Sequence, residues 1–413
     1  MAEASLGALA LMTRQPLSPE DARILGLERG HVRGHTLKVV VVEGALEVGA
    51  LRERVRKRIG AAPVLTRILD PGPPPAWVDD PDFELDEHVG GGTSIDLAEL
   101  AARRIEERLD RSRPLWSLES APLPGERTAL LVRLHHALAD GMTAMRLLET
   151  VLFDPHPEER PPSLARAALA PPRRAAPLRV PSALLRELAG HGRPTPLDRP
   201  PGERRQAAFV DADLERIRQI GHSAGATVND VVLAAVAGAL RAWIGPVDGV
   251  RVKVPVCLHS ADGEANRDSF LVVDLPLQQP DPVQRLRAVA AGTRQRKAAR
   301  DAESVDHFFA DLSHLSPRLE RLAQAWASSP RVFTLNVSNV PGPRGERAVL
   351  DAPVVLLYSL AEVAHRHALR ISVVSGMGRL TYGLCADPDA VGPIDPLAEA
   401  MKAELAALAA AAA

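Results

Sequence analysis

The sequence predicts an α/β or α+β protein in two halves, each with a mixed sheet flanked by helices. A chain of 413 residues is too long for one ordinary hydrophobic core. Val-rich segments with strand character alternate with segments whose apolar residues recur at helical spacing. A stretch rich in Pro, Arg and Ala, 155–206, is expected to be a crossover linker between a first half, 1–154, and a second half, 207–413.

The first half is expected to contain two strands and three helical segments. Strand 128–134 is apolar on both faces, which predicts that it is buried. The other expected elements are, in chain order, strand 35–42, helix 46–59 with its basic face toward solvent, a proline loop at 71–75, helix 97–109 and a helical segment over 142–152.

The second half is expected to begin with two helices, 211–220 and 227–243. Thr227 and Asp230 have the spacing of a capping box, with Asp in place of the usual Glu or Gln. The elements expected after these helices are strand 250–256, helix 281–300, strand 332–337, a hairpin of strands 368–374 and 379–385, and a C-terminal helix.

Composition and charge exclude several classes of protein. The formal net charge is -2, so the chain lacks the overall basic field of a nucleic-acid-binding protein. Its longest apolar run, Val231–Leu240, is far shorter than the roughly 20 residues of a membrane-spanning helix. Cys257 and Cys385 lack metal-ligand spacing and are expected to be reduced core residues, which suits a cytoplasmic protein.

Two adjacent histidines at the end of strand 128–134 are the main candidates for chemistry. They begin the run His135-His136-Ala137-Leu138-Ala139-Asp140-Gly141. Neighbouring residues of a strand point to opposite faces, so we expect one imidazole to pack and the other to face a cleft. Gly141 permits a tight turn, and Asp140 can stabilise that turn by accepting hydrogen bonds.

The residues alone leave three interpretations of this pair open. In the first, one histidine is a general base, because the unperturbed pKa of imidazole is near neutral. In the second, the pair and Asp140 bind a metal ion, which the divergence of adjacent strand residues disfavours. In the third, both are hydrogen-bonded core histidines without chemistry, which is the usual outcome for an arbitrary pair.

The run resembles the HHxxxDG motif of bacterial wax ester synthase/diacylglycerol acyltransferases. That motif alone also fits condensation domains and other acyltransferases of the same superfamily. A set of elements in the order of the first family, from about residue 17 to the C-terminus, makes the resemblance more specific. These are Leu17-Ser18-Pro19, Pro114-Leu115-Trp116, Asn229-Asp230, Ser338-Asn339-Val340-Pro341-Gly342-Pro343 and a hairpin over 375–387.

The resemblance implies a chloramphenicol-acetyltransferase-like fold with a tunnel between its two halves. It implies that His136 is the catalytic base, that His135 supports the loop, and that Asp140 is architectural and bonded away from the imidazole. Asn229 is expected to position the reacting groups. The remaining candidate substrate-binding residues are Pro114, Leu115 and Trp116, as a wall of the acceptor channel, together with Asp230 and Asn339.

The activity that the resemblance implies is O-acyl transfer from acyl-CoA to a fatty alcohol or diacylglycerol, giving wax ester or triacylglycerol. Acyl-CoA is then a co-substrate, and no cofactor or metal is expected. The apolar products suggest peripheral contact with a lipid droplet or with the inner face of the plasma membrane. Two alternatives keep the fold: transfer to a polyketide-like or other secondary alcohol, and lipid binding without catalysis.

A competing motif predicts different chemistry. Gly221-His222-Ser223-Ala224-Gly225 matches GxSxG, which would make Ser223 the nucleophile of a serine thioesterase. Such an elbow needs a strand before the serine and a helix after it. The preceding segment is predicted to be helical, so Gly221 is better interpreted as the end of that helix and Gly225 as a turn.

Overall fold

The chain divides into two compact units that differ from the expected halves. The computed structural model describes residues 14–28, 30–93, 96–156, 195–258, 267–299, 329–330 and 332–412. The first unit comprises 1–164 and 342–362, and the second comprises 165–341 and 363–413. The expected linker 155–206 lies mostly outside the described residues.

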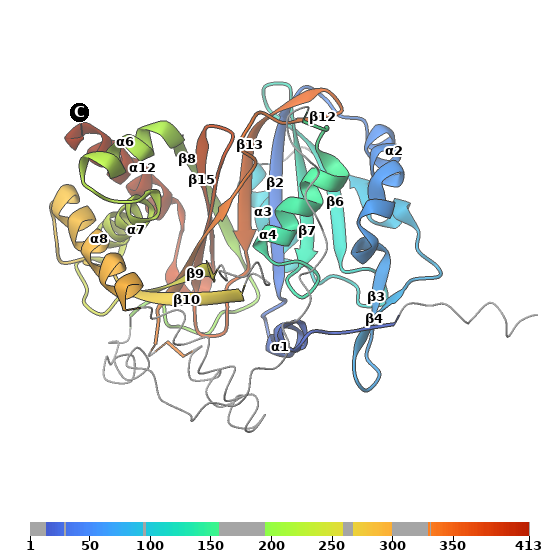
Figure 1. Cartoon of the computed structure of the whole chain (residues 1–413), viewed down its shortest axis with the longest axis horizontal. Helices are drawn as coiled ribbons and strands as arrows, with labels where there is room; N and C mark the ends of the chain where they lie inside the picture. The colour runs from blue at the N-terminus through green and yellow to red at the C-terminus, as the bar shows by residue number, and fades with distance from the viewer. Residues whose placement is uncertain are drawn as a thin grey trace, which may run out of the picture. The chain divides into compact units, whose positions relative to one another are not determined.

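A six-stranded sheet forms the centre of the first unit, in the order β12-β13-β2-β7-β6-β5. Its two central strands, β2 and β7, are antiparallel, with His35 opposite His135. Both are buried, as was predicted for β7. The strands are β2 (His35–Glu43), β5 (Val89–Gly91), β6 (Trp116–Leu123), β7 (Arg127–His135), β12 (Ala348–Val349) and β13 (Ala352–Ala361) (Figure 1).

Strand β13 comes from the part of the chain that the sequence assigned to the second half. It pairs antiparallel with β2, with Leu357 opposite Val40, so 342–362 belongs to the first unit. An unpaired β2 would leave a row of backbone hydrogen-bonding groups without partners beside the core. No strand was expected over Ala352–Ala361. Its pairing with β2 joins residues more than 300 positions apart in the chain, which a local pattern cannot predict.

Helices cover both faces of this sheet. Arg133 reaches the helix α3 (Leu97–Glu106) by donating to the Arg104 carbonyl at 2.7 Å. Val132 and Leu134, on the opposite face, border the helices α2 and η4. Helix α2 buries Leu51 and Val55 and carries Arg56 and Lys57 outward, as predicted. Two further basic residues of α2 turn inward instead: Arg54 donates to the Leu152 carbonyl and Arg58 to the Phe153 carbonyl. The remaining bounds are α1 (Pro19–Leu27), α2 (Val48–Arg58), η1 (Ile59–Ala61), η2 (Pro63–Thr66), η3 (Leu85–Glu87), α4 (Gly141–Leu147) and the π-helical turn η4 (Leu148–Leu152).

A small second sheet of the first unit has the order β1-β4-β3. Its strands are β1 (Gln15–Pro16), β3 (Arg67–Asp70) and β4 (Ala76–Asp79). The proline loop predicted at 71–75 joins the last two of these strands.

The second unit also contains a six-stranded sheet, in the order β10-β9-β11-β14-β15-β8. The predicted C-terminal hairpin is confirmed, and Met377 and Gly378 turn the chain with φ of 50° and 72°. The strands are β8 (Gln206–Asp213), β9 (Arg251–Leu258), β10 (Arg267–Asp274), β11 (Leu335–Pro341), β14 (Leu369–Gly376) and β15 (Arg379–Ala386).

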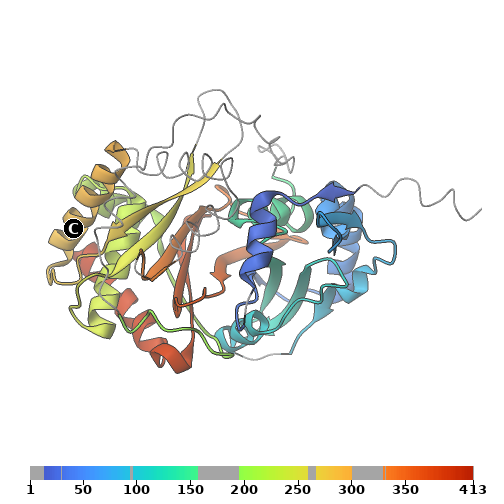
Figure 2. The ribbon, with the colours of Figure 1, turned by 90° about the horizontal axis from the view of Figure 1, so that it is seen from below.

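The helices of the second unit gather on one face of that sheet (Figures 1 and 2). The most buried is α7, whose predicted capping box between Thr227 and Asp230 is present. Glu404 of α12 occupies the space beside Gly238 of α7 that a side chain there would need. The helices are α6 (Leu214–Ser223), α7 (Val228–Ile244), α8 (Pro282–Ala298), α11 (Pro388–Val391) and α12 (Asp395–Ala411).

Two further sequence predictions concern burial and membrane spans. Cys385 is buried and free, as expected, whereas the side chain of Cys257 lies outside the described residues. Among the described helices, none by itself has the length and apolar composition of a membrane span. Helices α6 and α7 meet that test only as a pair, and the chain bends by 93° between them.

Candidate active site

The histidine run begins at the last residue of β7, and its two imidazoles have different environments. The side chain of His135 is 3% exposed, whereas His136 is partly exposed. The backbone pairing of β7 with the chain before β2 extends one residue past His135, because the His136 amide donates to the Gly34 carbonyl at 2.8 Å. The predicted division, with one histidine packed and the other accessible, is therefore present.

His135 holds the loop that follows it. Its Nδ1 accepts from the Ala137 amide at 3.0 Å, so the ring proton is on Nε2, which donates to Glu28 Oε1 at 2.6 Å. The carbonyl of His135 accepts from the amides of Leu138 at 2.9 Å and Ala139 at 3.2 Å. These bonds wrap the HHxxxDG segment around a buried ring.

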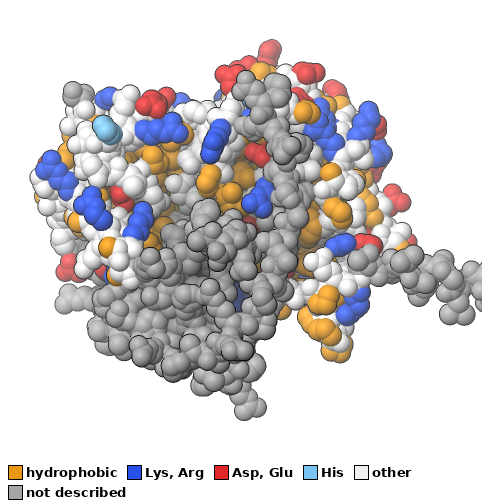
Figure 3. Space-filling model, viewed as in Figure 1, with side chains coloured by type: hydrophobic (Ala, Val, Ile, Leu, Met, Phe, Trp, Pro, Cys, Tyr) orange, Lys and Arg blue, Asp and Glu red, His pale blue; other side chains and the backbone are white. Residues whose placement is uncertain are grey.

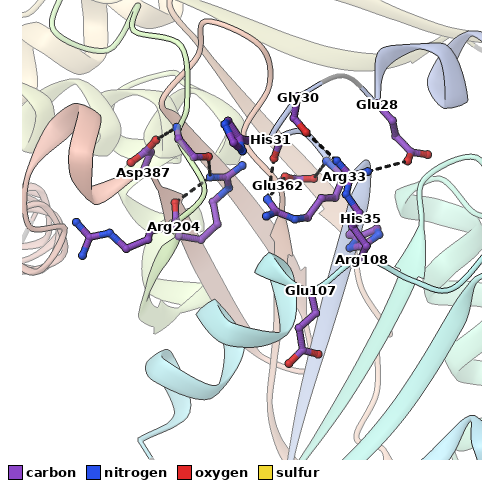
Figure 4. Close-up of polar contacts among 12 residues, drawn as sticks. Glu28, Gly30, His31, Arg33, His35, Glu107, Arg108, Arg204, Glu362 and Asp387 are labelled. Carbon is purple, nitrogen blue, oxygen red and sulfur yellow. Dashed lines mark hydrogen bonds and ion pairs between the residues drawn. The ribbon is translucent and has the colours of Figure 1, made fainter.

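Glu28, at the end of α1, is the carboxylate that orients His135. Its side chain is only 6% exposed and pairs with Arg111 at 2.8 Å and with Arg108 at 3.7 Å. Arg108 lies between Glu28 and Gly30 (Figure 4). Burial by itself raises the pKa of the Glu28 carboxyl, but the hydrogen bonds from His135 and Arg111 and the positive charge of Arg111 hold this pKa below its usual range.

Gly34 makes a close approach that only glycine allows. Its φ is +71°, and a Cβ there would lie 2.9 Å from His135 Nε2. Sequence analysis missed both Gly34 and Glu28. Glu28 is 107 residues away from His135 along the chain, so no local pattern connects them. The only available signal was a glycine directly before a strand.

The Nδ1 atom of His136 faces a carbonyl of its own loop. Its Nδ1 lies 3.4 Å from the Ala139 carbonyl, inside the same loop. A carbonyl only accepts hydrogen bonds, so this contact favours the tautomer with its proton on Nδ1. The lone pair of the neutral ring is then on Nε2, the atom that would take a proton from a substrate.

Asp140 and Gly141 start the helix that follows. The Asp140 carboxylate accepts from the Thr143 amide at 2.7 Å and so caps α4. In the described residues it has no hydrogen bond to either imidazole, which agrees with the architectural placement that the resemblance implied. Gly141 is the first residue of α4 and has no positive φ.

The Pro114-Leu115-Trp116 segment is core structure beside the histidines. The Leu115 carbonyl accepts from the His135 amide at 3.0 Å. Trp116 donates from Nε1 to the Leu65 carbonyl at 2.7 Å and stacks on His88 at 4.7 Å. Trp116 also lines a small apolar cavity of about 30 Å³, together with Leu134 and residues of α2, α4 and η4. A role in acceptor binding stays a prediction for this segment.

A third histidine, His35, faces His135 across the β2–β7 pair. The two rings are 5.9 Å apart in an edge-to-face arrangement. Burial and then the positive charge of Arg133 lower the pKa of His35 to about 2. His35 is therefore neutral at physiological pH and belongs to the core.

Two of the three predicted residues of the second unit line a different cavity. Asn229 and Asn339 line a cavity of about 250 Å³ within that unit. Asp230 does not line it, because its carboxylate accepts from the Thr227 amide at 2.8 Å and from Thr293 Oγ1 at 2.6 Å. Asp230 therefore joins the start of α7 to α8, and its carboxylate stabilises the fold instead of facing the cavity.

Comparison with known families decides the class of protein. The wax ester synthase/diacylglycerol acyltransferase catalytic domain matches residues 17–193, and the WS/DGAT C-terminal domain matches 265–409. A Mycobacterium tuberculosis (strain H37Rv) protein, named as a putative diacylglycerol O-acyltransferase, is 32% identical over 386 residues, covering 80% of this chain and 76% of that protein. The chain belongs to the wax ester synthase/diacylglycerol acyltransferase family.

Further relatives of this acyltransferase agree. A second Mycobacterium tuberculosis protein with the same kind of name is 29% identical over an alignment of 444 positions, which covers 91% of this chain and 92% of that protein. The wax ester synthase/diacylglycerol acyltransferase of Marinobacter aquaeolei VT8 superposes with a TM-score of 0.74 at 22% identity, over 96% of this chain and 99% of that one. The first condensation domain of the CDA synthetase superposes with a TM-score of 0.62 at 17% identity, over 97% and 96% of the two chains. The predicted chloramphenicol-acetyltransferase-like fold is confirmed.

In this acyltransferase, the GxSxG run is not a nucleophile elbow. Ser223 is the last residue of α6, and its hydroxyl donates to the Ile220 carbonyl at 3.0 Å. A helix, not a strand, precedes it. Gly225 turns the chain with a φ of +61°, as predicted. Helix α6 ends two residues after Gly221, where a Cβ would lie 2.8 Å from the Ala226 carbonyl oxygen.

Proposed function

We propose that this acyltransferase moves a long-chain acyl group from acyl-CoA to a fatty alcohol or diacylglycerol, with His136 as the general base. The observation that carries the proposal is the environment of His136. It is partly exposed at the end of β7, and its Nδ1 is directed at the Ala139 carbonyl. The buried His135–Glu28 pair behind it keeps the loop in one conformation.

The chemistry needs only one such base. As the alcohol oxygen bonds to the thioester carbonyl carbon, Nε2 of His136 takes the hydroxyl proton. The tetrahedral intermediate then collapses, the carbon–sulfur bond breaks, and the imidazolium returns its proton to the leaving thiolate. Because a thioester is already activated, no covalent acyl-enzyme is required, which agrees with the internal hydrogen bond of Ser223.

Two observations support the choice of substrates. The mycobacterial relatives carry the name of diacylglycerol O-acyltransferases. A starter condensation domain, solved in complex with C8-CoA, superposes with a TM-score of 0.59.

The test is thiol release from palmitoyl-CoA with and without hexadecanol or dioleoylglycerol. Release is expected to need the alcohol, and His136→Ala is expected to lower kcat by roughly a hundredfold or more. His365→Ala, at an exposed histidine of the second unit, is the control and should match the wild type.

Other results would redirect the assignment. Release without any alcohol would indicate a thioesterase and contradict the proposal. Wild-type activity of His136→Ala would remove His136 from the mechanism. Transfer only to a polyketide-like or other secondary alcohol would keep the mechanism and replace the acceptor. Binding of acyl-CoA with no turnover of any alcohol would favour a non-catalytic lipid-binding protein.

We also propose peripheral contact with a membrane or lipid droplet, because the substrates and products are apolar. Flotation with phospholipid vesicles that contain dioleoylglycerol tests it. A protein that stays entirely at the bottom of the gradient would contradict this proposal without affecting the assignment of the reaction.

A further inference from the structure

The connector 30–34, which joins α1 to β2, contacts both histidines of the HHxxxDG segment through Gly34. The Gly34 carbonyl accepts from the His136 amide at 2.8 Å. Gly34 also leaves room for the His135 ring, since a Cβ there would lie 2.9 Å from His135 Nε2. The position of the Gly34 peptide therefore determines where the backbone of His136 lies.

The connector depends on contacts with other parts of the chain to keep one conformation. Glycines lie at both of its ends, Gly30 with a φ of +59° and Gly34 with a φ of +71°, and glycine is the residue with the greatest conformational freedom. At the first end, the Gly30 carbonyl accepts from Arg108 at 2.7 Å, but this arginine is 53% exposed. Water competes for so exposed a hydrogen bond, which makes its net contribution small.

Glu362, the residue that follows β13, makes a contact on each side of Gly34. Its Oε2 accepts from the Arg33 amide at 2.6 Å (Figure 4). Its own amide donates to the His35 carbonyl at 3.1 Å. One residue therefore holds the two chain neighbours of Gly34, with its side chain on one and its main chain on the other.

The Glu362 carboxylate is buried, where a charge is costly. Acidic side chains are scattered over the face of the molecule in Figure 3, where water solvates them. The side chain of Glu362 is instead 2% exposed, and it lies 3.8 Å from the Arg33 guanidinium. A buried carboxylate is stable only when hydrogen bonds and an opposite charge replace its hydration. Arg33 supplies both, which ties the carboxylate to the connector.

This contact extends the influence of β13 beyond the end of its ladder. The β2–β13 pairing stops at Thr36 opposite Ala361, so the connector lies outside it. Arg33 and Glu362 are 329 positions apart in the chain, yet both belong to the first unit. Because hydrogen bonds to an ionised carboxylate are roughly twice as strong as neutral ones, the Glu362 side chain is well suited to fix the Arg33 amide.

We propose that Glu362 is a positioning residue for acyl transfer, which holds Gly34 and, through it, the backbone of the base His136. The inference rests on the proposed function, in which Nε2 of His136 takes the proton of the alcohol. Glu362 acts through the connector, and no proton passes to its carboxylate. A displacement of about 1 Å can lower the rate of a reaction by roughly a hundredfold. A small shift of the His136 backbone is therefore enough to change kcat.

The experiment separates kcat from KM, with palmitoyl-CoA as donor and hexadecanol or dioleoylglycerol as acceptor. Glu362→Ala is expected to lower kcat roughly tenfold or more, because the base is displaced. The KM of each substrate should change by less than about twofold, since Glu362 supports the base and not a substrate. Glu362→Gln keeps an oxygen that can accept from the Arg33 amide, and it should recover most of kcat.

The matched control is Ser359→Ala, on the same strand. The Ser359 hydroxyl accepts from the buried Lys38 ammonium at 2.7 Å, so this change also removes a buried contact between β13 and β2. Ser359→Ala is expected to lower the melting temperature, as Glu362→Ala does, and to leave kcat unchanged. If both variants lowered kcat in proportion to their loss of stability, Glu362 would belong to the fold alone and the proposal would be overturned.

A double variant shows whether Glu362 acts through His136. In the His136→Ala background the base is absent, so Glu362→Ala is expected to cause no further fall in the residual rate, measured with radiolabelled palmitoyl-CoA. The same fold-change in both backgrounds would mean that Glu362 affects the rate independently of His136, and the proposal would fail.

Hydrogen exchange followed by mass spectrometry tests the inference without any turnover. Glu362→Ala, but not Ser359→Ala, is expected to speed exchange roughly tenfold or more in the peptides that cover 30–35 and 135–139, where the Arg33 and His136 amides lie. Unchanged exchange there would overturn the proposal even if the reaction is as proposed. Wild-type activity of His136→Ala, or thiol release without an alcohol, would instead overturn the proposed function, and faster exchange would then still show that Glu362 holds the connector.

Discussion

At the end of β7, two neighbouring imidazoles differ because of the groups that surround them. His135 has both ring nitrogens engaged, by the Ala137 amide and by Glu28. His136 is partly exposed and has its Nδ1 near a carbonyl. Strand geometry alone predicted that the two rings would diverge. Glu28 could not be predicted, because its contact with His135 depends on how α1 packs.

The first prediction concerns Glu28. Glu28→Leu is expected to lower kcat at least tenfold with little change in KM, because His135 loses the acceptor that orients it and Arg111 is left without its carboxylate. We also expect a loss of about 2 kcal/mol in the free energy of unfolding. Glu28→Gln keeps an acceptor oxygen and should retain most of the activity.

The measurements for Glu28 are steady-state kinetics and thermal unfolding. Glu99→Leu is the control, because it removes an exposed helical ion pair with Arg103 in the same unit. A folded Glu28→Leu protein with wild-type kcat would show that His135 needs no carboxylate.

A second prediction at this scale concerns His35 and pH. Its pKa is lowered to about 2 in the folded protein, whereas an unfolded histidine titrates near 6.5. Below pH 6.5 the unfolded state therefore binds one proton more, and stability falls by up to about 1.4 kcal/mol per pH unit from this residue. His35→Phe should reduce that slope between pH 6 and 4.5 in urea unfolding experiments. A slope equal to that of the wild type would contradict this expectation, and exposed His365→Phe is the control.

At the scale of the elements, α7 shows how much a local pattern can specify. The spacing of Thr227 and Asp230 predicted the start of the helix, and the capping box is present. The bond from Asp230 to Thr293 joins α7 to a helix more than 60 residues later. The local rule for caps therefore predicted the contact of Asp230 with Thr227 but not its contact with Thr293.

Because Asp230 both caps α7 and accepts from Thr293, its removal is expected to destabilise the protein more than the loss of an ordinary helix cap. Asp230→Ala is expected to lower the free energy of unfolding by about 2 kcal/mol or more, because a buried hydroxyl also loses its acceptor. Asp281→Ala, at the exposed cap of α8, should cost about 1 kcal/mol. Denaturant unfolding of both variants and of Thr293→Val, combined in a double-mutant cycle, checks the comparison. Additive effects of Asp230→Ala and Thr293→Val would contradict it.

At the scale of the whole molecule, the chain returns to its first unit to complete a sheet. Strand β13 covers the edge of β2, and the buried Lys38 ammonium donates to Ser359 Oγ of that strand at 2.7 Å. Glu362, just after β13, accepts from the Arg33 amide at 2.6 Å (Figure 4). The first unit is therefore incomplete until most of the chain exists.

This connectivity predicts the behaviour of a fragment. Residues 1–164 alone are expected to aggregate or to lack a cooperative thermal transition, since the edge of β2 and the Lys38 ammonium lose their partners. Fusing 342–362 to this fragment through a flexible linker should restore a cooperative transition, whereas the same segment with its residues shuffled should not. Circular dichroism and gel filtration measure both properties. A monomeric fragment with a cooperative transition would show that β13 is dispensable.

The sequence by itself determined what depends on neighbours along the chain. Strand β7, helices α2 and α7, the C-terminal hairpin and the histidine loop all follow from periodicity, caps and turns over a few residues. The ordered motifs identified the family, and with it the fold and the reaction class. The tertiary structure decided which distant groups meet: Glu28 and Gly34 at His135, β13 beside β2, and Asn229 with Asn339 around one cavity. These contacts join residues far apart in the chain, and their partners are selected by packing and hydrogen bonding in the folded state, which no local pattern contains.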